Sequence, residues 1–224
     1  RLGYEIKRDF TNFSLKISKG LKRPQQKFVH QMVYGILAGN KLHLSEIARS
    51  LKENITLKKT IDRLSRNLGA FDGKQVVMQD YLSLVKQHIK EDYAVIVIDN
   101  SDIAKPASKK LEALSEIRDG STGEITQGYL TIEAAVLSES AKMPLPVYEK
   151  VFSAAEEGFV SETHENLCCL QSLSENFSPK CVRTLDRGFD ANDYYRYFLK
   201  RRERFVIRVK KNRSVIYNGK TCNI

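Results

Sequence analysis

The sequence lacks several features that mark other classes of protein. It has no run of about 18 apolar residues, so no membrane-spanning helix is expected. Its opening residues, RLGYEIKRDF, do not have the basic-then-apolar order of a signal peptide. The chain begins with Arg1, which suggests a piece of a longer protein, and it has no internal repeat or low-complexity segment. These absences favour a globular domain of a cytoplasmic protein.

The four cysteines do not have the spacing of a disulfide framework or a metal site. They form no CxxC pair, and Cys168 and Cys169 are adjacent. His164 lies four residues before Cys168, as zinc ligands on a helix can, but no second pair completes a set of four. We therefore expect reduced thiols rather than bound zinc.

Positive charge is in excess, and it is unevenly distributed. The chain has 37 Lys and Arg against 27 Asp and Glu, a net charge of +10. Residues 1–90 hold 18 basic side chains against 7 acidic, residues 91–182 hold 7 against 16, and residues 183–213 hold 11 against 4. Basic flanks around an acidic centre suit a polyanion held at the edges of a cation site. A solvated basic surface fits the charge alone equally well.

The first 70 residues have the pattern of helices. Pro24 predicts the start of a helix that runs to about Leu37, and Ser45 and Thr56 are candidate N-caps of two shorter helices. Two short helices joined by a tight turn resemble a helix-turn-helix. The second helix carries four candidate DNA contacts, Lys58, Lys59, Arg63 and Arg66. The alternative is a helical bundle with a polar outer face.

Two apolar runs further along the chain each end in an aspartate. YAVIVID ends in Asp99, and KCVRTLD ends in Asp186. Such runs indicate buried strands, and an Asp at the carboxyl end of a buried strand lies where α/β folds place their sites. Two converging carboxylates suit Mg²⁺ or Mn²⁺, with phosphate as the third party. Asp102 is a possible substitute for Asp99 as a ligand, but it is expected to lie beyond the strand. The alternative role for Asp186 is to start a turn before Gly188.

The remaining pattern predicts an α/β fold with the element order β-β-β-α-β-α-β. The expected elements are strands at 93–99, 127–138 and 145–153, a helix from Ser161 to about Asn176, a strand at 180–186, a helix at 191–202 and a strand at 204–210. Residues 100–126 are expected to form a polar connection. Three antiparallel strands and a crossover to a strand parallel to the first make a ribonuclease H-like sheet, in which the Asp99 and Asp186 strands are neighbours.

These motifs together resemble a known family. The segment LDRGFDANDYYRYFLKRRERFVIRVKKNR, residues 185–213, is similar to the second-aspartate region of DDE transposases of bacterial insertion sequences, in the IS-four-like cut-and-paste group. The IVID run that ends at Asp99, the GYLTIEAAVL strand and the segment from Leu21 to Gln26 are also similar, so that the resemblance covers about residues 20–213.

The resemblance implies a domain organisation and a set of ligands. It implies a helical DNA-binding region at 1–74, a ribonuclease H-like catalytic core at 75–211, and at 212–224 the start of a β-rich insertion. The family's third carboxylate lies in a Tyr-Arg-Glu-Lys signature beyond that insertion, and this sequence does not contain it. The chain is therefore expected to carry two of three acidic ligands and to be inactive by itself.

The implied activity is cleavage and transfer of DNA strands at transposon ends. Asp99 would bridge two Mg²⁺ or Mn²⁺ ions, and Asp186 would hold one of them. The residues expected to neutralise phosphates in this region are Arg187, Arg208, Lys210, Lys211 and Arg213. The implied partners are double-stranded DNA and a second copy of the chain in a synaptic complex, and the implied location is the nucleoid in a bacterial cytoplasm.

Two other functions compete with this interpretation. A DNA-binding remnant without chemistry would lack the third carboxylate and would use residues 20–70. A phosphatase with an aspartyl-phosphate intermediate would need Asp-x-Asp, but Asp99 and Asp102 are one residue too far apart. We therefore discount the phosphatase.

Overall fold

The computed structural model describes residues 2–89, 94–140 and 143–223. The chain separates into two compact units, unit 1 at residues 1–87 and unit 2 at residues 88–224. This boundary falls later than the one expected after residue 74, because the helix that follows residue 74 packs on unit 1. Gly20 N donates to Asp80 Oδ2 at 3.2 Å. No helix of the described residues is long and apolar enough to cross a membrane.

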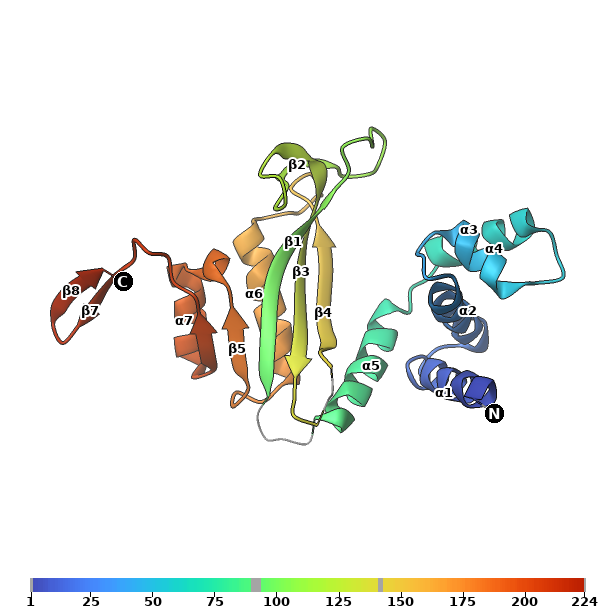
Figure 1. Cartoon of the computed structure of the whole chain (residues 1–224), viewed down its shortest axis with the longest axis horizontal. Helices are drawn as coiled ribbons and strands as arrows, with labels where there is room; N and C mark the ends of the chain where they lie inside the picture. The colour runs from blue at the N-terminus through green and yellow to red at the C-terminus, as the bar shows by residue number, and fades with distance from the viewer. Residues whose placement is uncertain (1, 90–93, 141–142, 224) are drawn as a thin grey trace. The chain divides into compact units, whose positions relative to one another are not determined.

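Unit 1 is built of helices (Figure 1). Its described elements are α1 (Leu2–Lys16), α2 (Arg23–Gly39), α3 (Leu44–Leu51), α4 (Leu57–Gly69) and α5 (Lys74–His88). Pro24 lies in the first turn of α2, as the sequence predicted, because proline lacks only an N–H that has no helical partner there. The predicted N-caps of α3 and α4 are confirmed only in part. The N-cap of α3 is His43, so Ser45 is not the cap, and Thr56 occupies the N-cap of α4 without a side-chain hydrogen bond.

A small apolar core joins α2, α3 and α4. Its buried members are Phe28, Ile47, Ala48 and Leu64, with Met32, Ile36, Leu44, Leu51, Ile61 and Phe71 packed around them. The helices α2 and α3 approach closely at Gly35, where an added Cβ would lie 2.3 Å from Ile47 Cγ2. A glycine is therefore required at this crossing.

Unit 2 is a mixed α/β structure. Its elements are β1 (Val95–Ala104), β2 (Ser115–Arg118), β3 (Ile125–Leu137), β4 (Leu145–Phe152), α6 (Glu162–Asn176), β5 (Val182–Leu185), the 3₁₀ turn η1 (Arg187–Phe189), α7 (Asn192–Arg201), β6 (Arg204–Ile207), β7 (Ser214–Tyr217) and β8 (Lys220–Asn223). The described sheet has six strands in the order β2-β3-β1-β5-β6, with β4 also paired to β3 (Figure 1). β1 is antiparallel to β3 and parallel to β5, as the sequence predicted.

Several strand bounds differ from the prediction. β1 does not end at Asp99 but continues to Ala104, because its antiparallel pairing with β3 extends to Ala104 and Gly128. The short strand β2 was not foreseen. It pairs with the first residues of β3 and occupies part of the predicted polar connection. β5 and β6 are shorter than predicted, and residues 90–93, which include the expected start of the first strand, lie outside the described residues.

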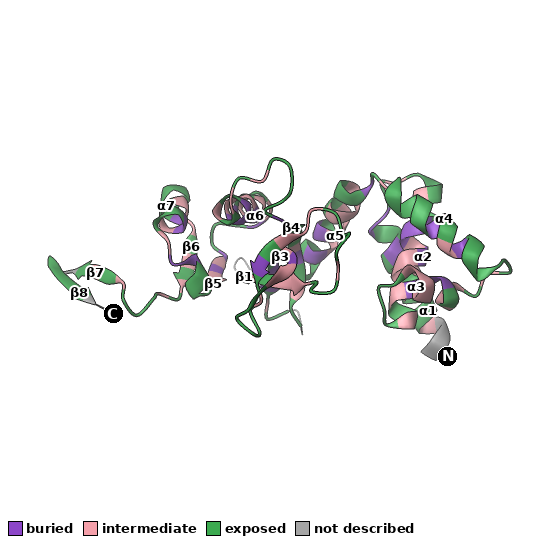
Figure 2. Ribbon diagram, turned by 90° about the horizontal axis from the view of Figure 1, so that it is seen from above, coloured by how far each residue is buried: buried purple, intermediate pink, exposed green. Residues whose placement is uncertain are grey.

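The described helices of unit 2 cover one face of the sheet. α6 and α7 lie on the same side (Figure 2), and Asn166 of α6 donates to the Tyr194 hydroxyl of α7 at 2.9 Å. Ile96 and Ile98 of β1 face this side and are buried, whereas Val95, Val97 and Asp99 alternate with them and are exposed. We call the side with these exposed residues the open face. Asp99 belongs to it.

The end of the described chain forms a hairpin. β7 and β8 pair antiparallel around Asn218 and Gly219, which have φ values of 50° and 73°. Positive φ at both central residues is the geometry of a type I′ turn, which Asn-Gly favours. The sequence expectation for residues 212–224 was the start of a β-rich segment, and the hairpin is compatible with it.

Candidate cation site and basic surfaces

Asp99 and Asp186 lie at neighbouring positions on neighbouring strands. The parallel ladder of β1 and β5 runs from Val95 and Val182 to Ile98 and Leu185. Asp99 and Asp186 each follow the last paired residue, so the ladder brings both carboxylates to the same end of the sheet. Asp99 lies on the open face, and Asp186 is also exposed. The structure therefore brings these two residues together, although Asp99 lies within its strand rather than at its end.

The electrostatics of Asp99 reflect this proximity. Partial burial raises the pKa of the Asp99 carboxyl, and the negative charge of Asp186 raises it further, while the hydrogen bond from the Asn100 backbone opposes both. Two carboxylates that repel each other at a partly exposed strand position are the arrangement in which a divalent cation stabilises both charges. The donor set therefore fits Mg²⁺ or Mn²⁺.

Asp186 also has a local structural role. Its Oδ1 accepts a hydrogen bond from Gly188 N at 2.7 Å and so caps η1. This is the turn-forming role that was the alternative for Asp186 in the sequence. The two roles are compatible, because the turn uses only one carboxylate oxygen.

The open face carries two further acidic residues that the sequence analysis missed. Glu133 of β3 is the cross-strand partner of Asp99, and Glu149 of β4 is the partner of Glu133. Asp99, Glu133 and Glu149 line one shallow cavity of about 350 Å³. No group of three or more His, Cys, Asp or Glu side chains in the described residues is arranged to hold a metal ion. Only strand register, which the sequence does not reveal, could have identified these two glutamates.

Asp102 is not placed to replace Asp99. It lies within β1, not beyond the strand, and it follows Asp99 by three positions, so its side chain points to the other face. Its Oδ1 accepts a hydrogen bond from Gly120 N at 2.9 Å. Asp102 therefore supports the 119–123 turn.

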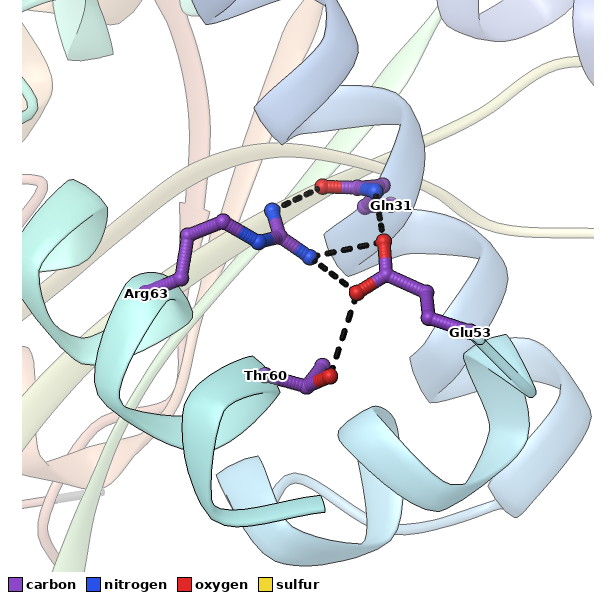
Figure 3. Close-up of polar contacts among 4 residues, drawn as sticks. All are labelled: Gln31, Glu53, Thr60 and Arg63. Atoms are coloured by element: carbon purple, nitrogen blue, oxygen red, sulfur yellow. Dashed lines mark hydrogen bonds and ion pairs between the residues drawn. The ribbon is translucent and has the colours of Figure 1, made fainter. Parts of the chain in front are cut away.

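Three of the four basic residues predicted on α4 are exposed, namely Lys58, Lys59 and Arg66. Arg63 is different. Its guanidinium is half-buried and forms an ion pair with Glu53 at 2.7 Å and a hydrogen bond with Gln31 Oε1 at 2.8 Å (Figure 3). Thr60 Oγ1 donates to the same Glu53 carboxylate at 3.1 Å. Arg63 thus joins α2, α4 and the turn before α4, so its guanidinium has a structural role, and its DNA contact stays a prediction.

A second set of basic residues lies around Asp186. Arg187, Arg208, Lys210 and Lys211 are exposed. Arg208 lies beyond β6, but its N–H donates to Leu185 O at 3.2 Å and keeps it beside the end of β5. Arg213 is partly buried and forms an ion pair with Asp190 at 2.5 Å. The guanidinium is thus already held by the protein, and its expected phosphate contact stays a prediction.

The described cysteines are all free thiols, and Cys168 Sγ lies 3.6 Å from His164 Nε2 on α6. No further zinc ligand joins this pair among the described residues.

No protein-family model matches the chain, and a comparison with curated proteins finds no similar sequence.

Proposed function

We propose that this chain is part of a DDE-type transposase in which Asp99 and Asp186 hold the divalent cations for DNA strand cleavage and transfer. The observation that carries the proposal is the neighbouring position of the two carboxylates at the end of the β1–β5 ladder, together with the influence of Asp186 on the pKa of Asp99. Bound between them, Mg²⁺ or Mn²⁺ would supply an activated water and a stabilised leaving oxygen.

The sheet supports a ribonuclease H-like core for this chemistry. The strand order β4-β3-β1-β5-β6, with three antiparallel strands followed by two parallel ones, is the order expected of that fold. In this interpretation Arg187, Arg208, Lys210 and Lys211 bind phosphates next to the carboxylates. A basic helix, α4, supplies a second DNA surface through Lys58, Lys59 and Arg66.

A DNA-binding protein without chemistry is the second candidate. It is favoured by one observation, which is that the described residues contain no three-ligand metal group. The two functions share DNA binding and differ in whether Asp99 and Asp186 matter for cleavage. A cleavage assay with Asp186→Asn separates them.

DNA binding is the first test. We expect the chain to bind duplex DNA with an affinity that falls steeply with salt, because bound Lys and Arg release counterions. Lys58→Glu/Lys59→Glu should weaken binding at least tenfold at about 100 mM salt. Lys109→Glu/Lys110→Glu makes the same charge change on an exposed loop of unit 2 and should weaken it much less. Equal effects of the two pairs would remove α4 from the DNA surface, and no affinity at low salt would refute the proposal.

Strand cleavage is the second test. We expect nicking of duplex DNA by this chain with Mg²⁺ or Mn²⁺ to be very weak, because two carboxylates hold a metal pair loosely. A version of the protein that also supplies a third acidic ligand should cleave, and Asp186→Asn should abolish that activity. Cleavage that survives Asp186→Asn would refute the assignment of the site.

A further inference from the structure

Asp190 is a buried aspartate four positions after Asp186 in the sequence. Its side chain is fully buried, and each polar group that contacts its carboxylate is a hydrogen-bond donor or a cation. Oδ1 accepts from the Tyr195 hydroxyl at 2.9 Å and pairs with Arg213 Nε at 2.5 Å, and Oδ2 accepts from Lys210 N at 2.8 Å. Burial would raise the pKa of Asp190, but these hydrogen bonds outweigh it and lower the pKa, so the carboxylate is ionised.

Arg213 also contacts the backbone of Asp190. Its Nη2 donates to the Asp190 carbonyl oxygen at 2.8 Å, and its guanidinium lies over the Tyr195 ring, 5.5 Å from the centroid. We call Asp190, Tyr195 and Arg213 the clamp. A guanidinium bound on two edges by one residue is fixed in position and has little capacity left for phosphate.

The clamp joins two segments that carry proposed site residues. On one side, η1 connects Asp186 to Asp190, whose N–H donates to Arg187 O at 3.2 Å. On the other side, Lys210 and Arg213 belong to the segment after β6. Residues 204–224 contain six Lys or Arg and no Asp or Glu, so the positive charges of this segment repel one another and the segment has no acidic side chain of its own to offset them.

We propose that Asp190 is a positioning residue that holds Asp186 and the basic residues Arg208, Lys210 and Lys211 in one fixed relation. This inference rests on the proposed function. Asp190 touches neither cation nor DNA in this scheme. It acts by making one DNA phosphate reach the cation and the basic segment at the same time, so that cation binding and DNA binding strengthen each other.

The test measures that coupling. The affinity for a duplex oligonucleotide is determined with and without Mn²⁺ at matched ionic strength, and the affinity with Mn²⁺ is divided by the affinity without it. This ratio, divided by the same ratio for Asp186→Asn, is the coupling factor. We expect a coupling factor of about five or more for the unchanged chain. Asp190→Asn and Arg213→Gln should each reduce it to about one while DNA binding without Mn²⁺ stays within about threefold. The double variant should be no worse than either single variant, because both break the same clamp.

Two further variants keep the test decisive. Tyr195→Phe removes one hydrogen bond from Asp190 and should lower the coupling factor in part, and it serves if Asp190→Asn does not fold. Asp193→Asn is the matched control, because this nearby aspartate is exposed and its ion pair with Arg196 is 4.0 Å long. Its coupling factor should not change.

Each outcome has one meaning. Coupling that persists in folded Asp190→Asn, Arg213→Gln and Tyr195→Phe overturns the inference and leaves the proposed function standing. A coupling factor of one in the unchanged chain contradicts the proposed function itself. If Arg213→Gln lowers the slope of log affinity against log salt by about one, in both the unchanged and the Asp190→Asn background, Arg213 is a phosphate contact and the clamp is refuted.

Discussion

The side chain of Asp99 is under electrostatic strain that a cation would relieve. Its pKa is raised by burial and by Asp186, so the ionised carboxyl is less stable in the folded chain than in the unfolded one. A group of this kind reduces stability at neutral pH and does so less as the pH falls and the carboxyl takes up a proton. Strain of this sign at an exposed strand position is typical of a binding site rather than of a structural one.

The first prediction follows from the upward shift of the Asp99 pKa. Asp186→Asn should raise the melting temperature of unit 2 at pH 7 by about 1–3 °C, since the charge that raises the Asp99 pKa is removed and Asn can still cap η1. The gain should shrink near pH 4. Glu157→Gln, an exposed change in the same unit, is the control and should have no such effect. A lower melting temperature for Asp186→Asn would mean that the turn, not repulsion, dominates.

The pKa of the Glu53 carboxyl is shifted in the opposite direction, downward. Burial alone would raise the pKa of its carboxyl, but the hydrogen bonds from Arg63, Thr60 and Gln31 lower it overall. Its contribution to stability is therefore complete above the ordinary glutamate pKa of about 4.3 and is lost as the pH falls below that value.

The second prediction uses this network. Glu53→Gln should destabilise unit 1 by roughly 1–3 kcal/mol at pH 7, because it leaves the half-buried Arg63 without its counter-charge. At about pH 3 the variant and the unchanged chain should differ much less. Urea unfolding followed by the helical circular dichroism signal measures both values. A difference that is the same at the two pH values would show that the Glu53 charge is not the stabilising feature.

Helix packing in unit 1 depends on the close approach of α2 and α3. The third prediction is that Gly35→Ala destabilises unit 1 by about 1–3 kcal/mol, because its Cβ would lie 2.3 Å from Ile47 Cγ2. Gly69→Ala is the control within the same unit, since nothing lies within 4 Å of that position and alanine favours a helix. Urea unfolding of both variants measures the change in the free energy of unfolding. Equal stability of the two would contradict the close α2–α3 packing.

Among the strands and helices, the sequence predicted what local patterns encode. Buried runs located β1, β3, β4 and β5. The helix expected from Ser161 to about Asn176 is α6, and Ser161 is its N-cap, with a side chain that accepts from His164 N. The four-residue strand β2 was missed because SEIR has too little apolar pattern to distinguish it from a loop. The length of β1 beyond Asp99 depends on pairing with β3, which is a tertiary effect.

The same limit applies to the candidate site. Asp99 and Asp186 could be found because each directly follows an apolar run. The roles of Arg63 and Arg213 could not, because their partners Glu53 and Asp190 are defined by contacts that basic composition does not reveal. Glu133 was missed for a related reason, since only strand register sets it opposite Asp99.

In the molecule as a whole, basic and acidic regions alternate along the chain, a distribution that supports the proposed action on DNA. Unit 1 carries the exposed Lys58 and Lys59, and the sheet of unit 2 carries Asp99 and Asp186 with Arg187 beside them. The two units are compact by themselves, so the proposed DNA binding by α4 and the proposed cation binding by the carboxylates should respond to separate substitutions.

Binding of a divalent cation by Asp99 and Asp186 can be measured by Mn²⁺ titration followed by electron paramagnetic resonance. We expect a Mn²⁺ site in the unchanged chain that is weakened at least tenfold by Asp99→Asn and by Asp186→Asn. Asp102→Asn, which changes a carboxylate on the other face of β1, should keep it. Mn²⁺ binding that is unaffected by either of the first two variants, or lost only in the third, would show that Asp99 and Asp186 are not the cation ligands.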